Sequence, residues 1–97
     1  MKASSKSIQP SNLRHKLGLN QQEFWSVVGV TQSGGSRYES GRSMPKPVRE
    51  LVRLVHIEGI DLAHVRRDDF EVAKHLRIKN VTLYRRLLQE SRESTAR

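Results

Sequence analysis

Residues 20–41, NQQEFWSVVGVTQSGGSRYESG, hold the side chains most suited to a specific binding chemistry. If the second half of this segment is helical, it presents amide, hydroxyl and guanidinium groups on one face, from Gln32, Ser33, Ser36 and Arg37. Such groups form hydrogen bonds with base edges in the major groove of DNA. The segment therefore predicts a helix that reads nucleic acid, and the rest of the chain must hold that helix in place.

Two short helices joined by a tight turn are predicted within this segment. Asn20 followed by Glu23 three residues later is the capping-box pattern of a helix start. Gly29 permits the positive φ of a turn, and Thr31 can cap a second helix that runs to about Ser40. The expected apolar face of the first helix consists of Phe24, Val27 and Val28.

Further helices are predicted on both sides of this pair. One runs from Pro10 or Ser11 to Leu17, and another begins near Pro47 and ends at Gly59. The second of these has an apolar stripe at helical spacing, made of Val48, Leu51, Val52, Leu54 and Val55. A short turn near 61–65 and helices over 68–77 and 80–89 follow. Since no strand pattern occurs, the fold class is predicted to be all-α.

The composition favours a small basic protein with a polyanionic partner. The 97 residues include 18 Lys and Arg against 10 Asp and Glu, which gives a formal charge of +8. Such a charge favours nucleic acid, because affinity for a polyanion grows with the number of phosphates neutralised. No segment approaches the roughly 20 apolar residues of a membrane span, and no signal-peptide core follows Met1. The absence of cysteine excludes disulfides and fits a cytoplasmic protein.

The titratable residues do not form a catalytic or metal-binding pattern. The histidines are His15, His56, His64 and His75. None is paired with another at the i, i+3 or i+4 spacing of helical metal sites. The neighbouring Asp68 and Asp69 diverge on a helix and are read as charge at its N-terminus. We therefore expect no enzyme activity, no catalytic residue, no metal and no cofactor.

Residues 11–58 resemble the lambda-repressor-like (Xre/Cro/CI) helix-turn-helix family of bacterial and phage regulators. The ordered series that carries the resemblance is Gln21, Gly29, Val30, Thr31, Gln32, Arg37, Tyr38, Glu39 and Gly41. The resemblance implies a compact five-helix bundle, here with additional C-terminal helices. It also implies that the helix over 32–40 lies in the major groove of a twofold operator, so that the protein acts as a homodimer on double-stranded DNA.

The resemblance also implies a role for each polar residue of the pair. Base contacts are implied for Gln32, Ser33 and Arg37. Contacts with the DNA backbone are implied for Gln21, Ser36, Ser40 and Arg42. Tyr38 takes the place of a buried aromatic or aliphatic residue, and we interpret it as part of the core.

Two positions depart from the family pattern. Trp25 stands where the family usually has a small residue, and Gly35 stands where it usually has Ile or Val. Trp25 can fill the volume above Gly35 and keep the packed volume constant. Alternatively, Trp25 lies partly on the surface and contacts a partner. Gly34 either lets the backbone approach DNA closely or helps to accommodate the indole.

The chain is divided by these patterns into four parts. Residues 1–9 are predicted to be a flexible basic tail, or a basic arm that touches DNA. Residues 10–60 form the helix-turn-helix core, and 61–90 form a helical extension for dimerisation or core completion. Residues 91–97 are predicted to be a frayed tail. Within the extension, residues 70–88 also resemble the Fis-type helix-turn-helix, which would make them a second DNA-reading unit.

Two functional hypotheses follow. The first is a dimeric, sequence-specific repressor that occludes a promoter. The second is the antitoxin of a toxin–antitoxin pair, which binds a toxin protein and also represses its own operon.

One residue argues against a second DNA-reading unit in residues 70–88. Arg77 occupies the position where the Fis-type turn normally has glycine.

Overall fold

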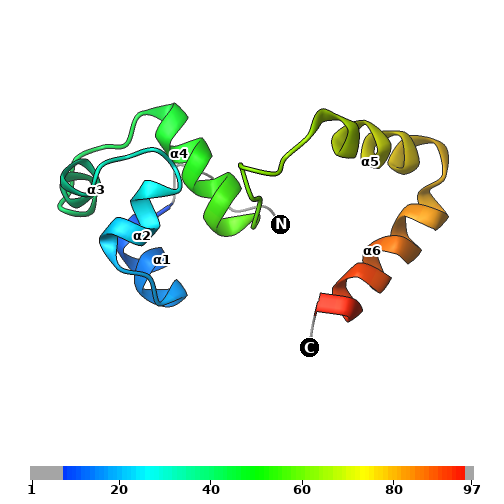
Figure 1. Cartoon of the computed structure of the whole chain (residues 1–97), viewed down its shortest axis with the longest axis horizontal. Coiled ribbons are helices and arrows are strands. Elements are labelled where there is room, and N and C mark those ends of the chain that lie inside the picture. Colours follow the sequence, from blue (N-terminus) through cyan, green and yellow to red (C-terminus); the bar gives the residue numbers. More distant parts are fainter. Residues whose placement is uncertain (1–7, 96–97) are drawn as a thin grey trace. The chain divides into compact units, whose positions relative to one another are not determined.

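The computed structural model describes residues 8–95 and, within that range, contains helices and no strands. The elements are α1 (Pro10–Leu17), α2 (Gln21–Ser26), α3 (Gln32–Glu39), α4 (Lys46–Val52), the π-helical segment η2 (Arg53–Ile57), α5 (Arg67–Lys79) and α6 (Val81–Thr95). The chain divides into two compact units, of which the first ends at Leu62 and the second begins at Ala63 (Figure 1). The all-α prediction is confirmed.

The ends of α2 and α3 form through the local signals that the sequence contains. Asn20 Oδ1 accepts from the Glu23 N–H at 2.8 Å, and Glu23 Oε1 accepts from the Asn20 N–H at 2.9 Å. Thr31 Oγ1 accepts from the Gly34 N–H at 3.1 Å, which caps α3. Gly29 has φ 78°, a conformation that glycine adopts without strain. The predicted capping box, turn and cap are confirmed.

The core of the first unit lies between α2, α4 and the loop before α4. Its buried hydrophobic side chains are Phe24, Trp25, Val28, Met44 and Val52. The prediction that Val27 belongs to this core is wrong, because its side chain is 51% exposed. Trp25 turns inward, so the buried face of α2 is centred between Phe24, Trp25 and Val28, and Val27 faces outward beyond the helix end.

A histidine on η2 closes the C-terminal end of α2. His56 Nε2 lies 2.8 Å from the Phe24 carbonyl oxygen, and its ring stacks on the Phe24 ring with centroids 3.9 Å apart. Since a carbonyl only accepts, this nitrogen carries a proton. Burial lowers the pKa of His56, and the hydrogen bond to the Phe24 carbonyl opposes that effect only in part. His56 therefore acts as a neutral cap for a helix of only six residues.

The lambda-repressor-like five-helix arrangement is not confirmed. The first unit contains α1 to α4, and η2 continues directly from α4. The short element expected near 61–65 is a turn over 62–64. The next helix, α5, belongs to the second unit.

The second unit is a pair of helices that meet at Asn80. The Asn80 side chain accepts from the Leu83 N–H at 3.1 Å, as expected for a cap. Both helices are longer than predicted: α5 ends at Lys79, and α6 continues to Thr95. Residues 91–95, assigned above to a frayed tail, are therefore helical, while residues 96–97 lie outside the described residues.

Pairs of side chains one turn apart explain the greater length of α6. Arg86 and Glu90 form an ion pair at 3.8 Å, and Gln89 donates to Glu93 at 3.2 Å. Such i, i+4 pairs stabilise a helix without any apolar stripe, and the periodicity argument detects only the stripe.

Two further predictions concern the basic tail at the start of the chain and the Fis-type turn in the second unit. Residues 1–7 of the predicted basic tail lie outside the described residues, but Ile8 packs against the core. In the second unit, Arg77 is helical and its guanidinium lies over the Tyr84 ring, 5.9 Å from the centroid. The turn that the Fis-type pattern needs at this position is therefore not formed. No helix in the described part of the chain is long and apolar enough to cross a membrane.

Candidate nucleic-acid interface

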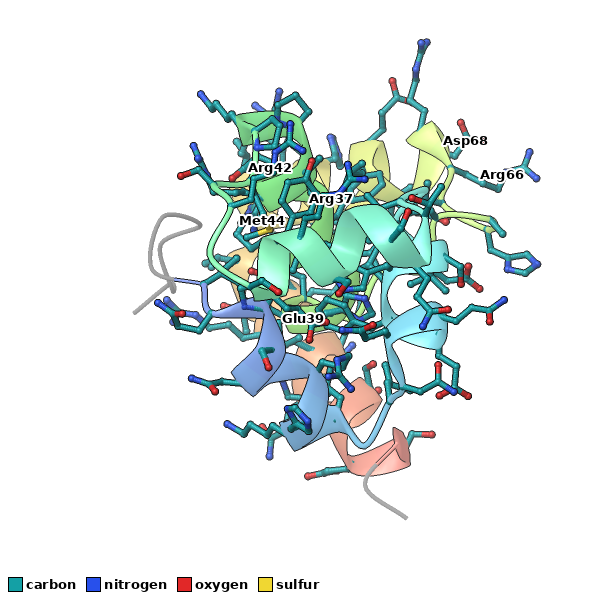
Figure 2. The ribbon with its side chains drawn as sticks, turned by 90° about the vertical axis from the view of Figure 1, so that its left-hand side faces the viewer. Arg37, Glu39, Arg42, Met44, Arg66 and Asp68 are labelled. Atoms are coloured by element: carbon teal, nitrogen blue, oxygen red, sulfur yellow. The ribbon has the colours of Figure 1, made fainter. Side chains whose placement is uncertain are left out.

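The polar face of α3 is segregated from the face that packs inward. At about 100° per residue, the side chains at 32, 33, 36, 37 and 40 fall within an arc of about 140°. Gly35, Tyr38 and Glu39 lie on the other side, where α3 packs against α1 and α2. Figure 2 shows Arg37 and Glu39 on opposite sides of α3. The helix thus has one face for a partner and one for the protein.

Trp25 lies directly on Gly35. The indole is fully buried, and a Cβ added to Gly35 would overlap its ring. The ring also packs edge-on against Phe24, with centroids 5.0 Å apart. The predicted exchange of large and small residues is confirmed, and the alternative of a surface tryptophan is wrong. A Cβ on Gly34 would instead approach Thr31 Oγ1 at 3.1 Å, so Gly34 does not accommodate the indole.

The carboxylate of Glu39 joins the first three helices. Arg14 of α1 donates to it twice, from Nε at 2.9 Å and from Nη2 at 3.0 Å. Trp25 Nε1 donates at 2.8 Å and Gln21 Nε2 at 3.3 Å, both from α2. The Glu39 and Arg14 side chains are only 7% and 13% exposed. This cluster (Arg14, Gln21, Trp25 and Glu39) is called the Glu39 cluster below.

The hydrogen-bond donors around Glu39 stabilise the negative charge of its carboxylate. Burial by itself would raise the pKa of the carboxyl group. The hydrogen bonds from Arg14, Trp25 and Gln21, together with the positive charge of Arg14, outweigh this effect and lower the pKa. Glu39 is therefore ionised at neutral pH, and its four hydrogen bonds fix the rotation of α3 about its axis.

The predicted contact residues differ in how freely they can meet DNA. Gln32, Arg37 and Arg42 are exposed, and within residues 8–95 none of their side chains makes a hydrogen bond or an ion pair. Ser33 Oγ lies 3.4 Å from Thr31 Oγ1, within its own helix start. Ser40 Oγ donates to the Ser36 carbonyl at 2.8 Å. The unengaged side chains are therefore an amide and two guanidinium groups.

Gln21 has a structural partner that the sequence analysis did not foresee. Its amide donates to Glu39, which leaves one amide hydrogen and its backbone N–H for a phosphate. Sequence reasoning also missed Arg14 and the carboxylate role of Glu39. The one available signal was that Glu39 falls one turn after Gly35, on the inward face; nothing local marks Arg14, which is 25 residues away.

One comparison with known proteins bears on the function of the first unit. A family model described as RsaL-like HTH domain matches residues 11–55. The match supports a helix-turn-helix DNA-binding domain in this segment. The match covers α1 except its first residue, all of α2 to α4 and most of η2, and it suggests a DNA-binding regulator. Membership in the Xre or lambda-repressor-like group is not confirmed. Neither the curated proteins nor the solved structures contain a significant match to the chain.

Proposed function

We propose that this protein is a sequence-specific transcriptional repressor that binds a twofold operator as a dimer. The observation that carries the proposal is the exposed polar face of α3. The opposite face of this helix packs on the buried Trp25 ring, and its Glu39 accepts a hydrogen bond from Trp25 Nε1. A helix-turn-helix domain places such a helix in the major groove. Occupancy of a promoter would then exclude polymerase. In this proposal the protein binds DNA and catalyses no reaction.

The residues of the interface divide into two groups. Gln32, Ser33 and Arg37 are assigned to base edges, because amide, hydroxyl and guanidinium groups discriminate between bases. Gln21, Ser36, Ser40 and Arg42 are assigned to the sugar–phosphate backbone, which fixes register without reading sequence.

Arg37→Ala tests base reading. Selection of bound duplexes from a random pool with the wild-type protein should enrich a palindromic site with half-sites roughly 34 Å apart. The variant should lose preference at one base pair of each half-site, with a loss of about 1–3 kcal/mol in specific binding. Lys74→Ala removes the same charge from an exposed position of α5 and should leave the selected sequence unchanged.

Two results would contradict the proposal. If Arg37→Ala selects the same site with the same preference at every position, Arg37 does not read a base. If the wild-type protein enriches no sequence, or a site without twofold symmetry, the dimeric repressor itself is wrong.

The second unit is the part of the chain assigned to dimerisation. None of its described residues is buried, and a domain below about 40 residues rarely supports a core of its own. A mostly apolar groove lies between α5 and α6, lined by Asp69, Val72, Ala73, Leu76, Tyr84, Leu87 and Leu88. We assign this groove to a second copy of the chain, because a twofold operator requires two recognition helices held in one assembly.

Val72→Asp tests this assignment. Val72 is 59% exposed, so an aspartate there costs the single chain little, but it places a charge in the proposed interface. We expect the dissociation constant of the dimer, measured by sedimentation equilibrium, to rise at least about tenfold, since a buried unpaired charge costs several kcal/mol. The affinity of the protein for its operator should fall as a result, because fewer molecules are dimeric.

Ile78→Asp is the matched control. Ile78 is also on α5 and 65% exposed, but it faces a different surface, with Glu71, Lys74 and His75. Its substitution should leave the dimer intact. Equal effects of the two variants would exclude this groove as the interface. A monomeric wild-type chain that binds a toxin through the groove would favour the antitoxin hypothesis instead.

A further inference from the structure

We propose that a recess beside the C-terminal end of α3 binds a phosphate group, with Arg42 and Arg49 as its cationic ligands. The inference deepens the proposed function and rests on it, because the phosphate would belong to the DNA backbone next to the bases that α3 reads.

Three parts of the first unit form the recess. Pro10 contributes from the start of α1, Gly41 to Ser43 contribute from the turn after α3, and Arg49 contributes from the first turns of α4. Among the described residues that line the recess, none is acidic. An anion there would meet two guanidinium groups and no opposing carboxylate.

Arg49 is positioned but incompletely paired. Its Nη1 donates to the Met44 carbonyl at 2.9 Å, which fixes the guanidinium at the base of the α3–α4 turn. Within residues 8–95, Arg49 Nε is the one buried side-chain nitrogen or oxygen that has no hydrogen-bond partner. Buried charged donors are rarely left without an acceptor. A phosphate oxygen in the recess that Arg49 lines would supply such an acceptor in the planar geometry that a guanidinium prefers.

Arg42 provides the second ligand from the rim. Its side chain is exposed and, within the described range, makes no hydrogen bond or ion pair. Figure 2 shows Arg42 on the same side of α3 as Arg37, so that a strand whose bases meet Arg37 would bring its phosphates toward Arg42. The start of α1 adds positive potential, because Pro10 opens the helix and the Gln9 side chain does not cap it.

Arg49→Met and Arg49→Lys test the site on duplex DNA. Arg49→Met should weaken binding to the selected operator and to a random-sequence duplex by the same factor, several-fold near 0.1 M salt. The slope of log affinity against log salt should become shallower by about one, because one fewer phosphate is neutralised. Arg49→Lys should keep the wild-type slope. Lys74→Met removes an equal charge elsewhere and should also keep it. Thermal unfolding of each variant reports any loss of stability, which does not change the salt slope.

Inorganic phosphate separates the two sources of the ligand. In the wild-type protein, the Arg49 Nε–Hε NMR signal, assigned by its loss in Arg49→Met, should shift on titration with phosphate and with random-sequence duplex. A shift with phosphate but an unchanged DNA salt slope would overturn the DNA-backbone assignment and leave a site for free anions. No shift and no change of slope would overturn the site altogether. A third outcome separates the phosphate site from the proposed function. If the wild-type protein enriches no sequence in the selection, but the salt slope on random-sequence duplex still depends on Arg49, the result supports the phosphate site and contradicts sequence-specific regulation.

Discussion

Gly35→Ala is expected to destabilise the protein by about 2 kcal/mol, although alanine is the better helix former. The substitution gains roughly 1 kcal/mol in helix propensity, so any net loss reflects packing. The new methyl group would overlap the Trp25 ring, which is buried and packs against the Phe24 and Tyr38 rings. Overpacking of a close-packed core costs about 1–3 kcal/mol and occasionally more.

A compensating variant makes this prediction specific. Trp25→Ala alone leaves a large cavity and should cost about 3–5 kcal/mol. In Trp25→Ala/Gly35→Val, the valine fills part of that cavity. The loss of stability in the double variant should therefore be smaller than the sum of the losses in Trp25→Ala and Gly35→Val measured separately. A coupling energy of about 2 kcal/mol is expected for residues in direct contact.

Urea unfolding followed by circular dichroism measures all these variants, including those without the single tryptophan. Gly34→Ala is the control, since its Cβ would meet Thr31 Oγ1 at 3.1 Å and Val30 Cγ1 at 3.3 Å without overlapping a buried ring. It should change the free energy of unfolding much less. A Gly35→Ala variant as stable as wild type, or strictly additive effects at positions 25 and 35, would show that packing of the indole does not depend on the missing side chain at Gly35.

Glu39→Ala is expected to cost about 3–5 kcal/mol at neutral pH. The change removes the acceptor of four hydrogen bonds and leaves the Arg14 guanidinium with little solvent and no counter-charge. Replacing both partners, as in Arg14→Met/Glu39→Met, should cost less than Glu39→Ala, because no uncompensated charge remains. An exposed pair provides the control: Glu90→Ala breaks the Arg86–Glu90 contact and should cost under about 1 kcal/mol.

The pH dependence provides a second measurement on the same cluster. The folded-state pKa of Glu39 is lowered from its ordinary value of 4.5, so the folded protein binds this proton less readily than the unfolded chain. Its contribution is therefore complete above about pH 4.5 and is lost as the pH falls through the lower folded-state pKa. Comparing the free energy of unfolding of wild type and Glu39→Gln over this range should show a difference that shrinks with acidity. A constant difference would mean that the carboxylate charge does not contribute.

Much of the helix-turn-helix could be predicted because its signals are local. The Asn20–Glu23 capping box, the Gly29 turn and the Thr31 cap each depend on residues within four positions of one another. The exchange between Trp25 and Gly35 was also predictable, since a departure from a family pattern at one position suggested its complement at the other. In α6, by contrast, apolar periodicity ended before the helix did.

The sequence by itself determined the all-α class, the two helices of the reading motif and the polar face of α3, because helix periodicity and capping act over a single turn. Only the tertiary structure decided that Val27 faces outward, that Arg14 meets Glu39 and that Arg49 keeps an unpaired donor at the recess. Each of these depends on how helices rotate against one another when they exclude water. That rotation follows from the shapes of residues far apart in the chain, above all the indole of Trp25 resting on Gly35.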